Sequence, residues 1–176
     1  AAVCFPIGLI MDKFGRRLTM LFLVLPFTLG WLLILLAQNV AMLMVGRFIT
    51  GIAGGAFCVT APAYTSEIAQ DSIRGTLGSF FQLMITVGIL FSYAVGSYTS
   101  VQVFNILCTL IPIIFGVVFF FMPESPNFLV KKNRNMEARE ALIKLRGTNY
   151  DVDSELNHLK FKAEESRNNH VSYLKA

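Results

Sequence analysis

Two long stretches of this 176-residue chain contain almost no charged residues. Between Leu18 and Ser66 the only charged residue is Arg47, and between Gly75 and Pro123 there is none. A helix on the surface of a soluble protein needs a polar or charged face, so these stretches exclude an ordinary soluble domain. The mean hydropathy of +0.60 agrees with a protein that resides in a membrane.

The chain also lacks the motifs that hold metals, bind phosphates or carry out catalysis. It has no G-x-x-x-x-G-K-[ST], G-x-S-x-G, H-E-x-x-H or C-x-x-C pattern. Its three cysteines, Cys4, Cys58 and Cys108, lie in apolar stretches, and we expect them to be small buried side chains. We therefore expect no enzymatic activity, no cofactor and no metal. The net charge of +4 does not form a basic stripe with interleaved aromatics, so nucleic acid is not an expected partner.

Apolar runs of membrane-spanning length are the main feature that is present. A hydrocarbon core of about 30 Å requires about 20 apolar helical residues. Four runs meet this requirement, at 18–37, 40–61, 76–96 and 101–122, and a shorter one at 1–11 is expected to be the end of a further span in which the chain begins. The sequence therefore predicts an all-α integral membrane protein with its transmembrane domain at 1–122.

The basic residues alternate between loops, which predicts the orientation. The loop after the first apolar run contains Lys13, Arg16 and Arg17, the third loop contains Arg74, and ten more basic residues follow Met122. The two loops between these contain no charge. Because short cytoplasmic loops carry an excess of Lys and Arg, we expect loops 12–17 and 69–75 and segment 123–176 to be cytoplasmic in a multi-pass protein of the plasma membrane.

Segment 123–176 is polar and is expected to be a cytoplasmic helical linker domain. Asn135 can cap a helix that ends at Gly147, with apolar residues at helical spacing on Ala138, Ala141, Leu142 and Leu145. A second segment, from Asp153 to about Ser166, carries Leu156, Leu159 and Ala163 on one side. These helices are too polar to span a membrane and are expected to lie against the cytoplasmic face of the membrane domain or against the rest of the protein. The alternative is a disordered tail.

The loop at 8–17 has a pattern that is typical of one transporter superfamily. Gly8 and Gly15 permit close packing and a tight turn, and Asp12 lies at a helix end beside three basic residues. Taken alone, these residues fit a simple positive-inside anchor equally well. Their spacing, however, resembles the signature loop of the major facilitator superfamily, G-x-x-x-D-x-x-G-R-[RK].

Further segments follow in the order found in the sugar porter family of that superfamily. They are Gly46-Arg47 with Gly51, Pro62 to Glu67 with Arg74-Gly75, Gln82 with Gly88-Ile89, Pro123-Glu124-Ser125-Pro126, and Leu145-Arg146-Gly147. The chain looks most similar to the facilitated trehalose transporter-like branch. The resemblance implies the major facilitator fold, from the end of its second helix through its sixth, followed by intracellular helices. The first helix and the carboxy-terminal half would lie outside this chain, and that half would be a partner.

The resemblance also implies the function, which is transmembrane sugar transport by alternating access. We expect facilitated diffusion of trehalose or of a hexose such as glucose, with the sugar and the lipid bilayer as partners. One alternative is a proton-coupled sugar symporter. Another is a protein that does not transport, either a sugar sensor or a truncated membrane product.

A polar stripe on the 76–96 segment is the candidate substrate site. At 100° per residue, an arc of about 80° contains Ser79, Gln82, Thr86, Ile89 and Tyr93. Such a stripe should face protein or a water-filled path, although hydrogen bonding between helices is the simpler alternative. The resemblance implies that Gln82 binds sugar, since an amide both donates and accepts hydrogen bonds. It also implies that Ile85 and Ile89 line the pocket, although as isolated residues both would be assigned to the core.

A second candidate site is a network of cytoplasmic charges. The resemblance implies that these residues form ion pairs that close an inner gate: Asp12, Arg16, Arg17, Glu67, Arg74 and Glu124. The alternative is a set of static pairs at helix ends. Asn127 occupies the place where sugar porters have a basic residue, so one gate pair is expected to be missing or weakened.

Other residues of these motifs are expected to be structural. Gly51 and Gly55 are four residues apart and should allow close helix packing. Arg47 is expected either to extend to the membrane surface or to contact a neighbouring helix. Gly8, Gly15, Pro123 and Pro126 complete this group.

Overall fold

The computed structural model describes residues 4–70, 72–147 and 151–173, and they divide into two compact units, 1–122 and 123–176. The first unit consists of α1 (Cys4–Phe14), α2 (Arg16–Leu35), α3 (Val40–Ile68), α4 (Arg74–Tyr98) and α5 (Val101–Phe120). The second consists of α6 (Pro126–Lys131), α7 (Asn135–Arg146) and α8 (Val152–Tyr173). The described residues contain helices and no strand, which confirms the predicted all-α class.

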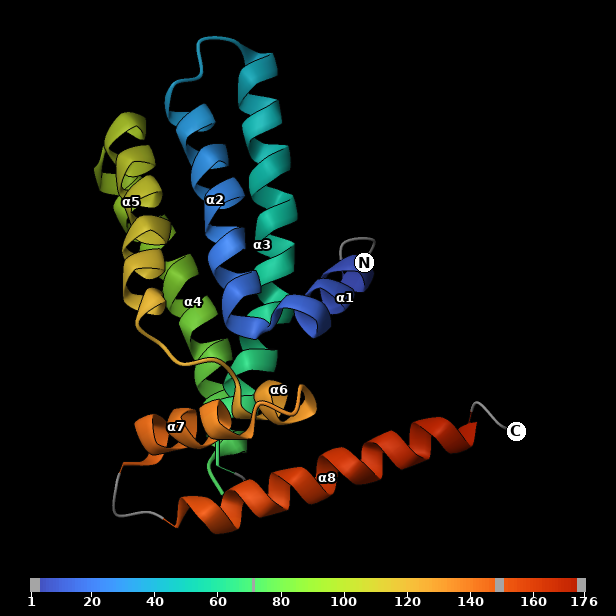
Figure 1. Ribbon diagram of the computed structural model, residues 1–176. Coiled ribbons are helices and arrows are strands. Elements are labelled where there is room, and N and C mark those ends of the chain that lie inside the picture. Colours follow the sequence, from blue (N-terminus) through green and yellow to red (C-terminus); the bar gives the residue numbers. More distant parts are fainter. Residues whose placement is uncertain (1–3, 71, 148–150, 174–176) are drawn as a thin grey trace. The chain divides into compact units, whose positions relative to one another are not determined.

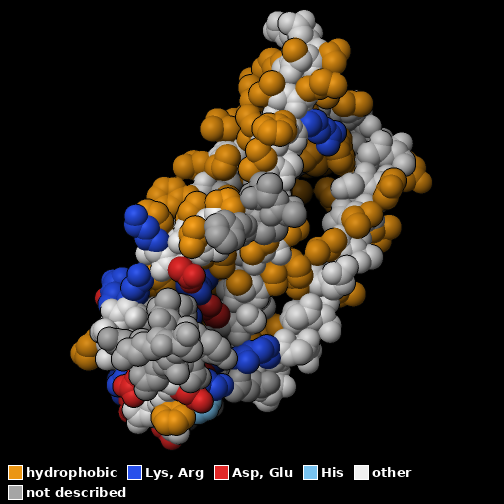
Figure 2. Space-filling model, turned by 90° about the vertical axis from the view of Figure 1, so that its right-hand side faces the viewer, with side chains coloured by type: hydrophobic (Ala, Val, Ile, Leu, Met, Phe, Trp, Pro, Cys, Tyr) orange, Lys and Arg blue, Asp and Glu red, His pale blue; other side chains and the backbone are white. Residues whose placement is uncertain are grey.

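Four helices of the first unit are long and apolar enough to cross a bilayer, and they are α2 to α5. The 29 residues of α3 extend over about 44 Å at 1.5 Å per residue, so this helix is longer than a hydrocarbon core of about 30 Å. In Figure 1, α2 and α3 lie side by side and antiparallel, and α5 lies on the other side of α2. Figure 2 shows that hydrophobic side chains cover the visible face of the long helices.

The core of the first unit forms where α3 meets its neighbours. Met20 of α2, Tyr64 of α3 and Phe119 of α5 are buried together. The rings of Tyr64 and Phe119 are 5.1 Å apart in an edge-on arrangement, which adds a favourable quadrupole interaction to the burial. A second cluster joins Ile7 and Met11 of α1 to α3.

Close contact between α2 and α3 depends on two glycines. A Cβ at Gly30 would lie 3.1 Å from the carbonyl oxygen of Gly46, and a Cβ at Gly46 would lie 2.9 Å from the carbonyl oxygen of Gly30. A Cβ at Gly51 or Gly55 would meet nothing within 4 Å. The close approach between α2 and α3 is therefore made by Gly30 and Gly46, which face each other across the interface, and the packing expected at Gly51 and Gly55 stays a prediction.

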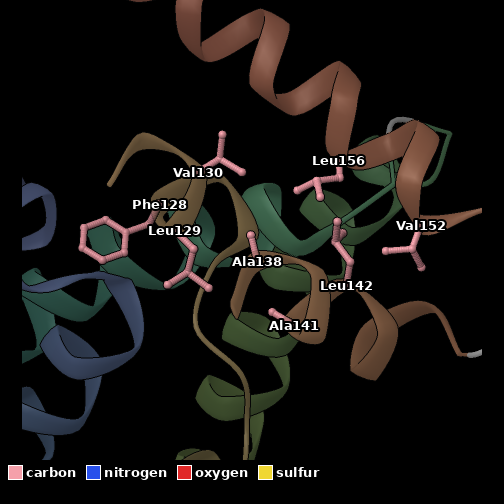
Figure 3. Packing of buried hydrophobic residues seen from close by; sticks show 8 residues of the cluster. All are labelled: Phe128, Leu129, Val130, Ala138, Ala141, Leu142, Val152 and Leu156. Carbon is pink, nitrogen blue, oxygen red and sulfur yellow. The ribbon is translucent and has the colours of Figure 1, made fainter. Parts of the chain in front are cut away.

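The second unit has its own hydrophobic core. Figure 3 shows the side chains of Leu142 on α7 and Leu156 on α8 approaching each other, with Val152 beside them. Leu142 is fully buried. Two bidentate Arg–carboxylate contacts join α7 to α8, from Arg146 to Glu155 and from Arg139 to Asp153. Helices α6 and α7 and the first part of α8 therefore pack around one core.

Two local expectations were wrong, and one helix was missed. Arg134, not Asn135, is the N-cap of α7, and its side chain contacts Glu137 at 2.6 Å instead of capping the helix. Cys58 is exposed rather than buried, because its side of α3 is turned away from the packed helices, whereas Cys108 is buried as expected. The short helix α6 was not predicted at all.

Candidate functional site

An ion-pair cluster forms where α1 ends and α2 begins. Gly15 between the two helices has φ 98°, a conformation that glycine adopts without the steric cost of a side chain. The tight turn places Arg16 against α3, where its Nε donates to Glu67 Oε1 at 2.9 Å. Its two terminal nitrogens reach the Asp12 carboxylate at 3.1 Å and the Met11 carbonyl at 3.2 Å.

Arg16 is a buried cation whose charge is compensated. Its side chain is 8% exposed, that of Glu67 is 18% exposed and that of Asp12 is 69% exposed. A buried charge is tolerated only when it is paired and hydrogen bonded. Glu67 therefore supplies most of the compensation, and the exposed Asp12 pair contributes about 0–1 kcal/mol.

Main-chain groups are among the partners of the other predicted gate residues. Arg17 donates to the carbonyl of Phe120, the last residue of α5, and its guanidinium lies 5.5 Å from the centroid of the Phe120 ring. Arg74 donates to the carbonyl of Ser66 at 3.1 Å. In the second unit, Glu124 accepts a hydrogen bond from the Ser125 amide at 2.9 Å. Helix-end carbonyls lack partners within their own helix, and basic side chains commonly bind them.

The candidate substrate residues lie on α4, which has no buried residue. Gln82 is exposed, Ile85 is 38% exposed and Ile89 is 53% exposed. The hydroxyls of the stripe bond within their own helix, since Ser79 donates to Gly75 and Thr86 donates to Gln82. These back-bonds occupy the hydroxyl protons of Ser79 and Thr86, so both residues donate to their own helix.

Arg47 contacts a neighbouring helix. Its guanidinium lies 5.9 Å from the centroid of the Trp31 ring on α2, at the limit of a cation–π interaction. This contact favours the expectation that Arg47 binds a neighbouring helix over the expectation that it extends to the membrane surface. Trp31 was not singled out from the sequence, because a contact between helices depends on their register and not on any local pattern.

The carbonyls of Met11 and Phe120 were also missed as partners. Both lie in the last turn of a helix, and the Met11 carbonyl also accepts from the Gly15 amide at 3.0 Å. The position of a helix end can be estimated from the sequence. Which arginine binds the carbonyls at that end cannot be estimated in this way.

Comparisons with known proteins place the chain in a family. The family described as "Sugar (and other) transporter" matches residues 1–176. The facilitated trehalose transporter Tret1 of Apis mellifera ligustica is 39% identical over 153 residues, which are 87% of this chain and 30% of that protein. The glucose transporter type 3 of Drosophila melanogaster is 36% identical over 163 residues, which are 93% of this chain and 32% of that protein. The chain thus spans about a third of the length of these relatives.

Among solved structures, the xylose transporter XylE from E. coli has a similar fold. In a partially occluded inward-open conformation it gives a TM-score of 0.78 at 21% identity, over 94% of this chain and 45% of that one. The predicted fold class and the resemblance inferred from the motifs are confirmed. The chain belongs to the sugar porter family of the major facilitator superfamily.

Proposed function

We propose that this protein moves a sugar across a membrane by alternating access. The match of the sugar transporter family over residues 1–176 is the observation that carries this proposal. The curated relatives described above are named as trehalose and glucose transporters, which supports facilitated diffusion of trehalose or of a hexose such as glucose. In such carriers two half-domains alternate around a site near the middle of the membrane.

Gln82 is the proposed sugar ligand within this chain. It lies on α4, whose long exposed face is available to a solute path. Its amide both donates and accepts, as the hydroxyl groups of a sugar require. Ile85 and Ile89 lie three and seven residues further along the helix, so they share its face and would pack against the less polar side of the sugar ring.

The Arg16 cluster is the proposed inner gate element within this half of the transporter. Arg16 already binds two carboxylates from different helices, so it couples the α1–α2 turn to the end of α3. In the complete transporter, the same gate network is proposed to include Arg17, Arg74 and Glu124. We place these loops in the cytoplasm and the protein in the plasma membrane, in keeping with the basic residues that they carry.

The test is uptake of radiolabelled trehalose and glucose by the full-length protein in proteoliposomes. Saturable uptake of either sugar is the expected result. No uptake above empty vesicles, with correctly inserted protein, would overturn the proposal and favour a sensor or another non-transporting product. Repeating the assay with a proton gradient distinguishes the two transport modes, because accumulation above the external sugar concentration requires coupling.

A pair of variants tests the site. Gln82→Ala is expected to raise the KM for uptake, whereas Leu83→Ala, also exposed but about 100° around the same helix, should leave it unchanged. Equal kinetics for Gln82→Ala and the wild type would remove Gln82 from the site. Amounts of inserted protein are compared for both variants, so that a folding defect is recognised.

A further inference from the structure

The ion pair between Arg16 and Glu67 joins two helix ends. Arg16 is the first residue of α2, and Glu67 is the last but one residue of α3. Helix ends fray, and the last turn of a helix opens more readily than its middle. The geometry of this pair therefore depends on what holds the two terminal turns in place.

A buried cluster lies one turn deeper on both helices. Met20 follows Arg16 by four residues on α2, so the two side chains share one face of that helix. Tyr64 precedes Glu67 by three residues on α3, and these two also share a face. The third buried member of the cluster, Phe119, comes from α5. One ring of α5 thus packs against both helices that carry the ion pair.

Phe119 also belongs to a column of aromatic rings. Its ring lies 5.1 Å from that of Tyr64 in an edge-on arrangement and is stacked on that of Phe115 at 5.2 Å. The ring of Phe115 lies 5.8 Å from that of Phe57 on α3, which lies 5.8 Å from that of Phe27 on α2. These are arrangements that aromatic pairs favour. The two contacts between α3 and α5 are about 10 Å apart along α3, so a rotation of its last turn breaks ring contacts.

We propose that Phe119 is a positioning residue for the Arg16–Glu67 pair and acts through Tyr64. By holding the Tyr64 ring, it fixes the height and the rotation of the last turn of α3 and so directs the Glu67 carboxylate toward Arg16. Ile68, the residue after Glu67, packs against the same cluster and holds the other side of that turn. For its meaning in transport the proposal rests on the gate function proposed above, and it adds to that gate an uncharged residue of a third helix.

A double-mutant cycle on the full-length protein in detergent tests the coupling, with the melting temperature as the readout and no sugar present. Phe119→Leu removes the ring, and Glu67→Gln removes the carboxylate. Glu67→Gln should lower the melting temperature about half as much in the Phe119→Leu background as in the wild type, because the pair is already weakened there. Phe22→Leu is the matched control, since Phe22 is 59% exposed on α2 and lies outside the cluster, so Glu67→Gln should keep its full effect in that background. Equal effects of Glu67→Gln in all three backgrounds would mean that Phe119 only fills the core, and the proposal would be overturned.

The Nε proton of Arg16 gives a second readout that core packing alone does not move. It is donated to Glu67 Oε1, so its exchange with water is controlled by opening of the terminal turns. In proton–nitrogen correlation spectra of the arginine-labelled protein, this exchange should be about tenfold faster in Phe119→Leu and unchanged in Phe22→Leu. Phe119→Met, which fills a similar volume without a ring, should behave in the same way and replaces Phe119→Leu if that variant does not fold.

An exchange rate equal to that of the wild type in the ringless variant would refute the positioning role. Neither measurement uses a sugar. Failure of the protein to take up trehalose or glucose would therefore remove the gate function and leave the positioning of the ion pair by Phe119 intact.

Discussion

Replacing Gly46 by alanine is expected to push α2 and α3 apart. The new Cβ would lie 2.8 Å from Cγ1 of Ile34 and 2.9 Å from the carbonyl oxygen of Gly30. The Ile34 side chain can rotate, but the Gly30 carbonyl is backbone and cannot. Ordinary van der Waals contact begins at 3.4 Å, so the helices must separate by about half an ångström at their closest point.

The expected cost is about 1–3 kcal/mol, the usual range for an overpacked interface. Thermal unfolding of the purified full-length protein, followed by tryptophan fluorescence, measures it as a lower melting temperature. Gly54→Ala is the control on the same helix, because its Cβ would lie 3.6 Å from the Phe27 ring, an ordinary contact. Alanine favours a helix over glycine by about 0.5–1 kcal/mol, so the control should be as stable as the wild type or more stable.

Equal melting temperatures for Gly46→Ala and Gly54→Ala would refute this reasoning. The double variant Gly30→Ala/Gly46→Ala adds a second check. Both changes act on the same helix separation, so their combined effect should be smaller than the sum of the two single effects. A fully additive result would indicate that the two glycines do not share one contact.

Three other predictions concern the ion pairs and the tail core. Glu67→Gln removes the main carboxylate partner of the buried Arg16 guanidinium. It should lower the free energy of unfolding by about 2–3 kcal/mol, somewhat less than the roughly 3–5 kcal/mol found for fully buried pairs. A melting temperature equal to that of the wild type would contradict this. Leu142→Ala should cost about 2–5 kcal/mol and speed amide hydrogen exchange in α6–α8, whereas Met136→Ala, 79% exposed, should change neither. The hydrogen-bonded Arg139 guanidinium lowers the pKa of Asp153. The pair therefore stabilises the tail above a pH of about 4, and this stability is lost as the pH falls through the lowered native pKa of Asp153. In circular-dichroism melts of segment 123–176, the melting temperature of Asp153→Asn should fall less on acidification than that of the wild type.

The membrane helices were predictable because a span leaves a long uncharged run in the sequence. The run at 101–122 became α5 at Val101–Phe120, and the run at 40–61 became the longer α3 at Val40–Ile68. The extra residues of α3 are more polar, and the prediction ended where the apolar run ended. The short α6 was missed although Ser125 and Pro126 are typical of a helix start, because six residues carry no readable periodicity.

Contacts between distant residues were not predictable in the same way. The Arg16–Glu67 pair was found among a larger set of charges only because the family's motif pointed to both residues. The contact of Arg17 with the Phe120 carbonyl joins residues 103 positions apart, and no pattern in the sequence links them. Gly30 was overlooked for a related reason, since a glycine allows close packing only when the facing helix presents another small residue at the same height.

The hydroxyl back-bonds of α4 bear on how this helix enters the membrane. Ser79, Thr86, Ser92 and Ser97 each donate to the carbonyl four residues earlier, so these polar groups are satisfied before any other helix is present. When a helix satisfies its own hydroxyl donors, the free energy of transferring these groups into lipid is lower. These hydroxyls can still accept a hydrogen bond from a solute, but they can donate one only by giving up bonds that the helix already makes.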